Sequence, residues 1–90
     1  MKINLYRQSS EEPEIFDVQG ASTVGEALAA ITNPEFQQSV LDSSGIRRFV
    51  SAYLGVPGQG VRNVRSELGM ETAIKEGEVL TLLIADPYTT

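Results

Sequence analysis

Alternating apolar and polar residues predict a β-hairpin at the start of the chain. In residues 2–7 (KINLYR), Ile3 and Leu5 fall on one side and the residues between them on the other, which is the two-residue period of a half-buried strand. The polar segment QSSEEPE then indicates a turn. A second short strand is expected at residues 15–18, and Gly20 ends it.

The second half of the chain predicts three more strands. Residues 48–54 alternate between two faces, with Val50, Ala52 and Leu54 on one and Phe49, Ser51 and Tyr53 on the other. The segment GVPGQG predicts a turn, and residues 61–64 predict a short strand at an edge of the sheet. Residues 70–77 predict a loop with one tight turn ending at Gly77. Residues 79–84 are almost continuously apolar, which is typical of a central, well-covered strand.

Between these two groups of strands, the apolar residues follow the period of a helix. Thr23 is a favoured cap residue, and Glu26 three positions later completes the spacing of a capping box. A helix is therefore expected from Thr23 to about residue 32. Its apolar stripe consists of Val24, Ala27, Leu28 and Ile31.

A second, shorter helix is expected at residues 34–41. Asn33 is a cap residue followed by proline at the first helical position, and Phe36 and Val40 then face inward. The segment DSSG ends this helix. The order of elements predicts an α+β domain in which one amphipathic helix packs across a mixed sheet.

Composition excludes several classes of function. The chain has no cysteine and no histidine, which excludes disulfides, thiolate nucleophiles, the usual catalytic triads and zinc sites. Its net charge is −5 and its basic residues are scattered, with only Arg47 and Arg48 adjacent, so nucleic-acid binding is not expected. No apolar run approaches the roughly 20 residues of a membrane span, and MKINLYRQ is unlike a signal peptide. We expect a cytoplasmic protein that does not bind membranes.

The acidic residues and glycines do not form a catalytic pattern. The carboxylates of Glu11, Glu12 and Glu14 surround a proline and are expected in a solvated turn. Gly58-Gln59-Gly60 lacks the helix start and the lysine of a phosphate-binding loop. No base–nucleophile pairing is visible, so we expect neither an enzyme nor a cofactor or metal site.

Two stretches of the sequence resemble a known family. One is STVGEAL at residues 22–28, and the other runs through 48–53 and then TAIKEGEVLTLL at 72–83. They are similar to the main helix, a strand, the glycine turn and the final strand of the MoaD/ThiS-type sulfur carriers. This family includes the small subunit of molybdopterin synthase. The resemblance implies a ubiquitin-like β-grasp domain over residues 1–84, with four to five strands, one main helix, a short second helix and a tail at 85–90.

The tail departs from the pattern of that family. Family carriers end in Gly-Gly, whose carboxylate is adenylated by an activating enzyme and later converted to a thiocarboxylate. The present sequence has no Gly-Gly pair, and its tail includes Asp86, Pro87, Tyr88, Thr89 and Thr90. Proline and β-branched threonine are stiff where the family uses glycine. We therefore expect a noncatalytic protein that docks on a larger activating-type or synthase-type enzyme. A genuine carrier with an atypical C-terminus and a structural assembly module remain open.

Strand alternation also predicts where a partner binds. The residues expected on the sheet face opposite the helix are Phe49, Tyr53, Val79, Thr81 and Leu83. The resemblance places a partner on this face. Arg47 and Arg48 lie beside it and are expected to be either rim charges or simply solvated. The alternative is that residues 34–41 or 61–71 cover these side chains, or that part of the alternation is out of phase.

Overall fold

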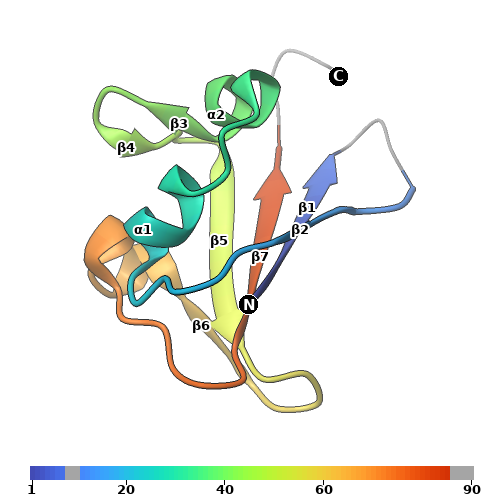
Figure 1. The fold of residues 1–90 in the computed structure, drawn as a ribbon, viewed down its shortest axis with the longest axis vertical. Coiled ribbons are helices and arrows are strands. Elements are labelled where there is room, and N and C mark those ends of the chain that lie inside the picture. Colours follow the sequence, from blue (N-terminus) through green and yellow to red (C-terminus); the bar gives the residue numbers. More distant parts are fainter. Residues whose placement is uncertain (8–10, 86–90) are drawn as a thin grey trace.

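The computed structural model describes residues 1–7 and 11–85 and is organised around one mixed sheet (Figure 1). Five strands pair in the order β2-β1-β7-β5-β6, with β1 and β7 parallel and the other pairs antiparallel. The strands are β1 (Lys2–Arg7), β2 (Glu14–Asp17), β5 (Val50–Gly55), β6 (Val61–Asn63) and β7 (Val79–Ile84). The last strand is central and β6 lies at an edge, so both predictions are confirmed.

Two short helices cover one face of this sheet. They are α1 (Val24–Ala29) and α2 (Pro34–Val40), and their apolar residues share one core with the inward residues of the strands. In the central pair, Ile3 lies opposite Leu80 and Leu5 opposite Leu82, and all four side chains are fully buried. The ring of Phe36 in α2 meets that of Phe16 in β2 edge-on, with centroids 4.9 Å apart. The predicted α+β arrangement is confirmed.

Side-chain caps start both helices where the sequence predicts them. The Thr23 Oγ1 accepts a hydrogen bond from the Glu26 backbone N–H at 3.2 Å. The Glu26 carboxylate reaches back to the N–H and hydroxyl of Ser22, at 2.8 and 2.6 Å. The Asn33 Oδ1 accepts from Glu35 and Phe36, at 2.9 and 3.3 Å. The helix α1 ends at Ala29, about three residues earlier than predicted.

The segment between α2 and β5 differs from the prediction. Residues 41–46 form a small hairpin, β3 (Leu41–Asp42) with β4 (Gly45–Ile46), where only the end of a helix is predicted. The Asp42 carboxylate closes its turn by accepting from the N–H and hydroxyl of Ser44, both at 2.8 Å. Two adjacent serines after an aspartate are typical of such a side-chain-closed turn, so the signal is present in the sequence.

The predicted strand at 48–54 starts two residues too early. A hydrogen bond of 3.0 Å from the Val50 N–H to the Arg47 carbonyl closes a turn, and β5 begins only at Val50. Arg48 and Phe49 therefore lie in the turn rather than in the sheet. The predicted loop at 70–77 and the residues before it contain two single-turn helices, η1 (Val64–Ser66) and η2 (Gly69–Glu71). The tight turn ending at Gly77, whose φ is 82°, is confirmed.

A nearly buried ion pair ties the edge strand β6 to the start of β7. The Glu78 side chain is 7% exposed, and its two oxygens accept from Nε and Nη2 of Arg62 at 3.1 and 2.6 Å. The Lys75 backbone N–H donates to the same carboxylate at 2.7 Å. Arg62 also donates to Glu67 and to the Ala73 carbonyl, at 2.8 and 3.0 Å. One guanidinium thus links β6, the residue after η1 and the loop before β7.

Replacing Leu28 by alanine tests the contact between helix and sheet. Leu28 is fully buried, so Leu28→Ala should lower the free energy of unfolding by about 2–5 kcal/mol in chemical denaturation. Ala29→Ser on the exposed side of the same helix is the control and should cost about 0.5 kcal/mol. Equal losses for the two variants would contradict this packing.

The pH dependence of stability tests the ion pair. Burial raises the pKa of Glu78, but hydrogen bonds from Arg62 and Lys75 and the nearby charge of Arg62 outweigh it, and the pKa lies below its ordinary 4.5. A lowered folded-state pKa stabilises the protein above the unfolded pKa, and this contribution is lost as the pH falls through the folded value. Glu78→Gln should cost about 1–3 kcal/mol at neutral pH.

The same variant should lose less stability than the parent on acidification below about pH 5, measured by urea unfolding at several pH values. The matched control is Glu14→Gln, which removes an ion-pair carboxylate that is 49% exposed and should cost less than about 1 kcal/mol. Parallel pH curves for Glu78→Gln and the parent would exclude Glu78 as the titrating group.

Candidate functional site

The face of the sheet opposite the helices carries three of the predicted partner-binding residues, Tyr53, Val79 and Leu83. Because the inward residues of each strand are fixed by the core, the residues between them point outward. We call this surface the outer face; its apolar members are Tyr6, Ile15, Tyr53, Val61, Val79 and Leu83. Between them lie the uncharged polar residues Asn4, Ser51, Asn63 and Thr81.

Strand register brings residues from five strands into rows across the outer face. One row runs from Tyr6 through Leu83 to Ser51. The neighbouring row places Thr81 between Asn4 and Tyr53 and extends to Ile15 and Asn63 at the two edges. The charged outward residues, Lys2 and Asp17, lie together at one corner. The centre of the outer face is therefore uncharged.

The described segments that could have covered the outer face pack elsewhere. Phe36 and Val40 of α2 belong to the core on the helix side, as does Val64 of η1. Tyr6 and Leu83 are each 39% exposed, and Ile15 and Val61 are 63% and 65% exposed. In the described part of the chain, residues 34–40 and 61–71 leave these side chains open to solvent. Of the residues predicted on this face, Leu83 is exposed, and Tyr53, Val79 and Thr81 are half-buried.

A shallow recess hollows one end of the outer face. Its volume is about 250 Å³, and its walls are the 55–59 turn together with Asn4, Val61, Val79 and Thr81. The wall formed by the turn depends on Gly55, since a Cβ there would lie 2.8 Å from both the Gly60 carbonyl oxygen and a methyl group of Val61. Close approach of β5 and β6 thus requires glycine at this position.

The structure groups only part of the predicted set. Tyr53, Val79 and Leu83 share the outer face, but Phe49 does not, because it precedes β5 and packs partly buried against the core. Arg48 is exposed in the same turn. The predicted tail residues 86–90 lie outside the described residues. Sequence reasoning missed Tyr6, Ile15 and Val61, although the alternation around Ile3 and Leu5 already placed Tyr6 on this side.

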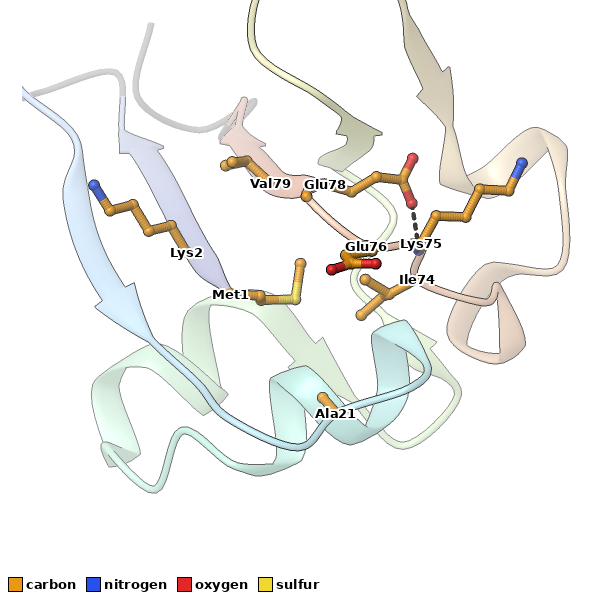
Figure 2. A pocket seen from close by; sticks show the side chains of 9 residues that line it. Met1, Lys2, Ala21, Ile74, Lys75, Glu76, Glu78 and Val79 are labelled. Carbon is orange, nitrogen blue, oxygen red and sulfur yellow. Dashed lines mark hydrogen bonds between the residues drawn. The ribbon is translucent and has the colours of Figure 1, made fainter.

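A second recess, of about 350 Å³, opens beside the start of β1 and β7 (Figure 2). In Figure 2 the Lys2 and Lys75 ammonium groups lie on opposite sides of the view, and the Glu78 carboxylate turns toward the Lys75 backbone. Glu78 is thus engaged by the ion pair with Arg62 and is not available as an acid or base. The charged groups around this recess do not form a catalytic pair.

Among residues 1–7 and 11–85, no three side chains of the metal-binding types gather closely enough to hold an ion. No helix of the described chain has the length and apolar character to span a bilayer.

Comparison with known proteins supports the fold. No protein-family model matches the sequence, and neither does any curated protein. The structure is similar to a chain in the crystal structure of the Amycolatopsis orientalis BexX/CysO complex, with a TM-score of 0.67 and 19% sequence identity over 93% of this chain and 96% of that chain. This likeness confirms the α+β, β-grasp fold predicted from the sequence.

Proposed function

We propose that this protein is a noncatalytic, ubiquitin-like protein that docks on a larger protein partner through its outer face. The observation that carries the proposal is the gathering of Tyr6, Tyr53, Val79 and Leu83 on a sheet face whose centre is uncharged. Cores of protein interfaces are enriched in aromatic residues and depleted of charge. The likeness to a chain from a BexX/CysO complex supports a docking role.

The partner that best suits this face is an enzyme of the activating or synthase type. This assignment follows from the resemblance to sulfur carriers, and the exposed recess beside Val79 offers a pocket for an apolar side chain of the partner. Phe49 and Arg48 would contribute from the end of the sheet, next to the segment that leads to residues 86–90. Docking would therefore involve the outer face first and the tail second.

Genuine sulfur-carrier chemistry is the second candidate, and the fold likeness to CysO is the observation that favours it. Against it stands the sequence of residues 1–90, which contains no Gly-Gly pair. The resemblance assigns that pair to a narrow channel of an activating enzyme, which a residue without Cβ suits. We favour docking without adenylation.

Truncation of the outer face tests docking. Tyr53→Ala and Leu83→Ser should each weaken binding to the purified partner, once it is identified by affinity capture and mass spectrometry, by more than about 1 kcal/mol in calorimetry. Leu68→Ser is the matched control, because Leu68 is 70% exposed but lies outside the sheet, and its binding should equal that of the parent. A Tyr53→Ala protein that melts much lower yet binds normally would refute the docking role.

Reaction with ATP tests the carrier alternative. The protein and its Thr89→Gly/Thr90→Gly variant are incubated separately with a cognate activating enzyme and labelled ATP, and acyl-adenylate is measured. Misplacing a reacting group by about 1 Å can cost on the order of 100-fold in rate, so only the variant should react readily. Equal reaction of both proteins, or a thiocarboxylate mass on the protein isolated from its own cells, would establish the carrier instead.

A further inference from the structure

A basic recess lies at the end of the sheet where β7 finishes, opposite the end shown in Figure 2. Its volume is about 260 Å³, and it is lined by Arg7, Gln38, Ser39, Arg47, Phe49 and Ile84. Arg7 and Ile84 continue the inward rows of β1 and β7, since they pair directly after the buried Leu5 and Leu82. The inward side chains of β1 are thus apolar at Ile3 and Leu5, and the next inward position is the positively charged Arg7.

The last turn of α2 fixes both guanidinium groups of the basic recess. Arg7 donates from Nη1 to the Ser39 hydroxyl at 3.3 Å and from Nε to Glu14 at 2.9 Å. Arg47 donates from Nε to the Gln38 carbonyl at 2.6 Å. Within the described residues, the Nη atoms of Arg47 make no hydrogen bond to the protein. Both guanidinium groups are therefore held in place by hydrogen bonds, and some of their N–H groups remain able to donate to a ligand in the recess.

Positive charge gathers at this end of an acidic protein. Arg65 donates to the Val50 carbonyl at 3.0 Å and also bonds the Arg47 carbonyl, so it holds the turn that carries Arg47 and Arg48. Four of the seven basic residues therefore lie at this end of the sheet, although the net charge of the protein is −5. They are Arg7, Arg47, Arg48 and Arg65. Two carboxylates interact with these arginines: Glu14 pairs with Arg7, and Asp42, whose pKa is lowered mainly by the hydrogen bonds that close its own turn, also feels the charge of Arg47. Among the described residues that line the basic recess itself, two are arginines and none is a carboxylate.

We propose that the basic recess binds an acidic segment of the partner protein, with a carboxylate on the Arg7 and Arg47 guanidiniums and an apolar neighbour against Phe49 and Ile84. This inference rests on the proposed docking function and adds the chemistry of the partner. A guanidinium fork matches a carboxylate, and arginine retains its charge at every physiological pH. A free inorganic anion would leave the apolar wall uncovered, whereas an acidic segment with an aliphatic residue fills both parts.

Binding of a short acidic peptide tests the basic recess independently of docking on the outer face. The probe is a fluorescein-labelled pentapeptide with leucine at its centre and aspartate or glutamate at the other positions, followed by anisotropy. Arg47→Gln should weaken binding by about three- to tenfold, the effect of one partly screened charge contact. Arg7→Gln removes the other guanidinium of the recess and should weaken binding to a similar extent, which keeps the test valid if Arg47→Gln folds poorly. Replacing the central leucine of the probe by serine should also weaken binding.

Matched controls separate a specific site from general attraction. Lys2→Gln and Lys75→Gln remove the same charge at the opposite end of the sheet and should leave affinity within about twofold. An equal loss in these variants, equal binding of the Asn/Gln version of the peptide, or displacement by inorganic phosphate at the concentration of the probe would overturn the inference. So would a dimer in sedimentation that Arg47→Gln dissociates, because a second copy would then occupy the recess.

The two proposals can fail separately. Tyr53→Ala and Leu83→Ser should bind the peptide like the parent, because the outer face and the basic recess lie on different sides of the sheet end. Peptide binding lost only in the arginine variants supports the recess whatever the fate of outer-face docking. Peptide binding lost equally in Tyr53→Ala would overturn it as a separate site.

Discussion

Parallel pairing of the first and last strands is the constraint on which the remaining structure depends. Ile3 and Leu5 align with Leu80 and Leu82, and every other inward residue is defined relative to this buried pair of rows. A slip of one residue would turn Asn4 and Thr81 into the core and expose the leucines, so the hydrophobic effect selects one register. The outer face and the basic recess are both consequences of that register.

The outer face and the basic recess differ in where their charged residues lie. On the outer face, charged residues are confined to a corner, and neutral polar residues such as Thr81 separate the apolar ones. At the end of the sheet, Arg7 occupies an inward position, where the hydroxyl of Ser39 and the carboxylate of Glu14 partly satisfy it. The one nearly buried carboxylate, Glu78, is instead fully used by Arg62. A charged group whose hydrogen bonds are all made within the protein, such as Glu78, stabilises the fold. An arginine that still has N–H groups to donate can bind a partner.

Part of the candidate surface could be predicted because strand alternation is local. The period of two placed Tyr53, Val79 and Leu83 correctly on one side of the sheet, and the glycine turn before β7 fixed where that strand begins. Phe49 was misplaced because alternation holds only inside a strand, and a turn closed between Arg47 and Val50 breaks the period just before β5. Ile15 and Val61 were missed because they join the surface only through pairing with neighbouring strands.

The sequence by itself determined the caps at Thr23 and Asn33, because a cap depends on residues two or three positions away. It also determined the inward residues of the strands through their two-residue period, and the central position of the last strand through its nearly continuous apolar run. Only the tertiary structure decided which outward residues form rows, because register is set by contacts between distant strands. It also decided that Arg7 and Arg47 share one recess, since the last turn of α2 brings them together across the end of the sheet.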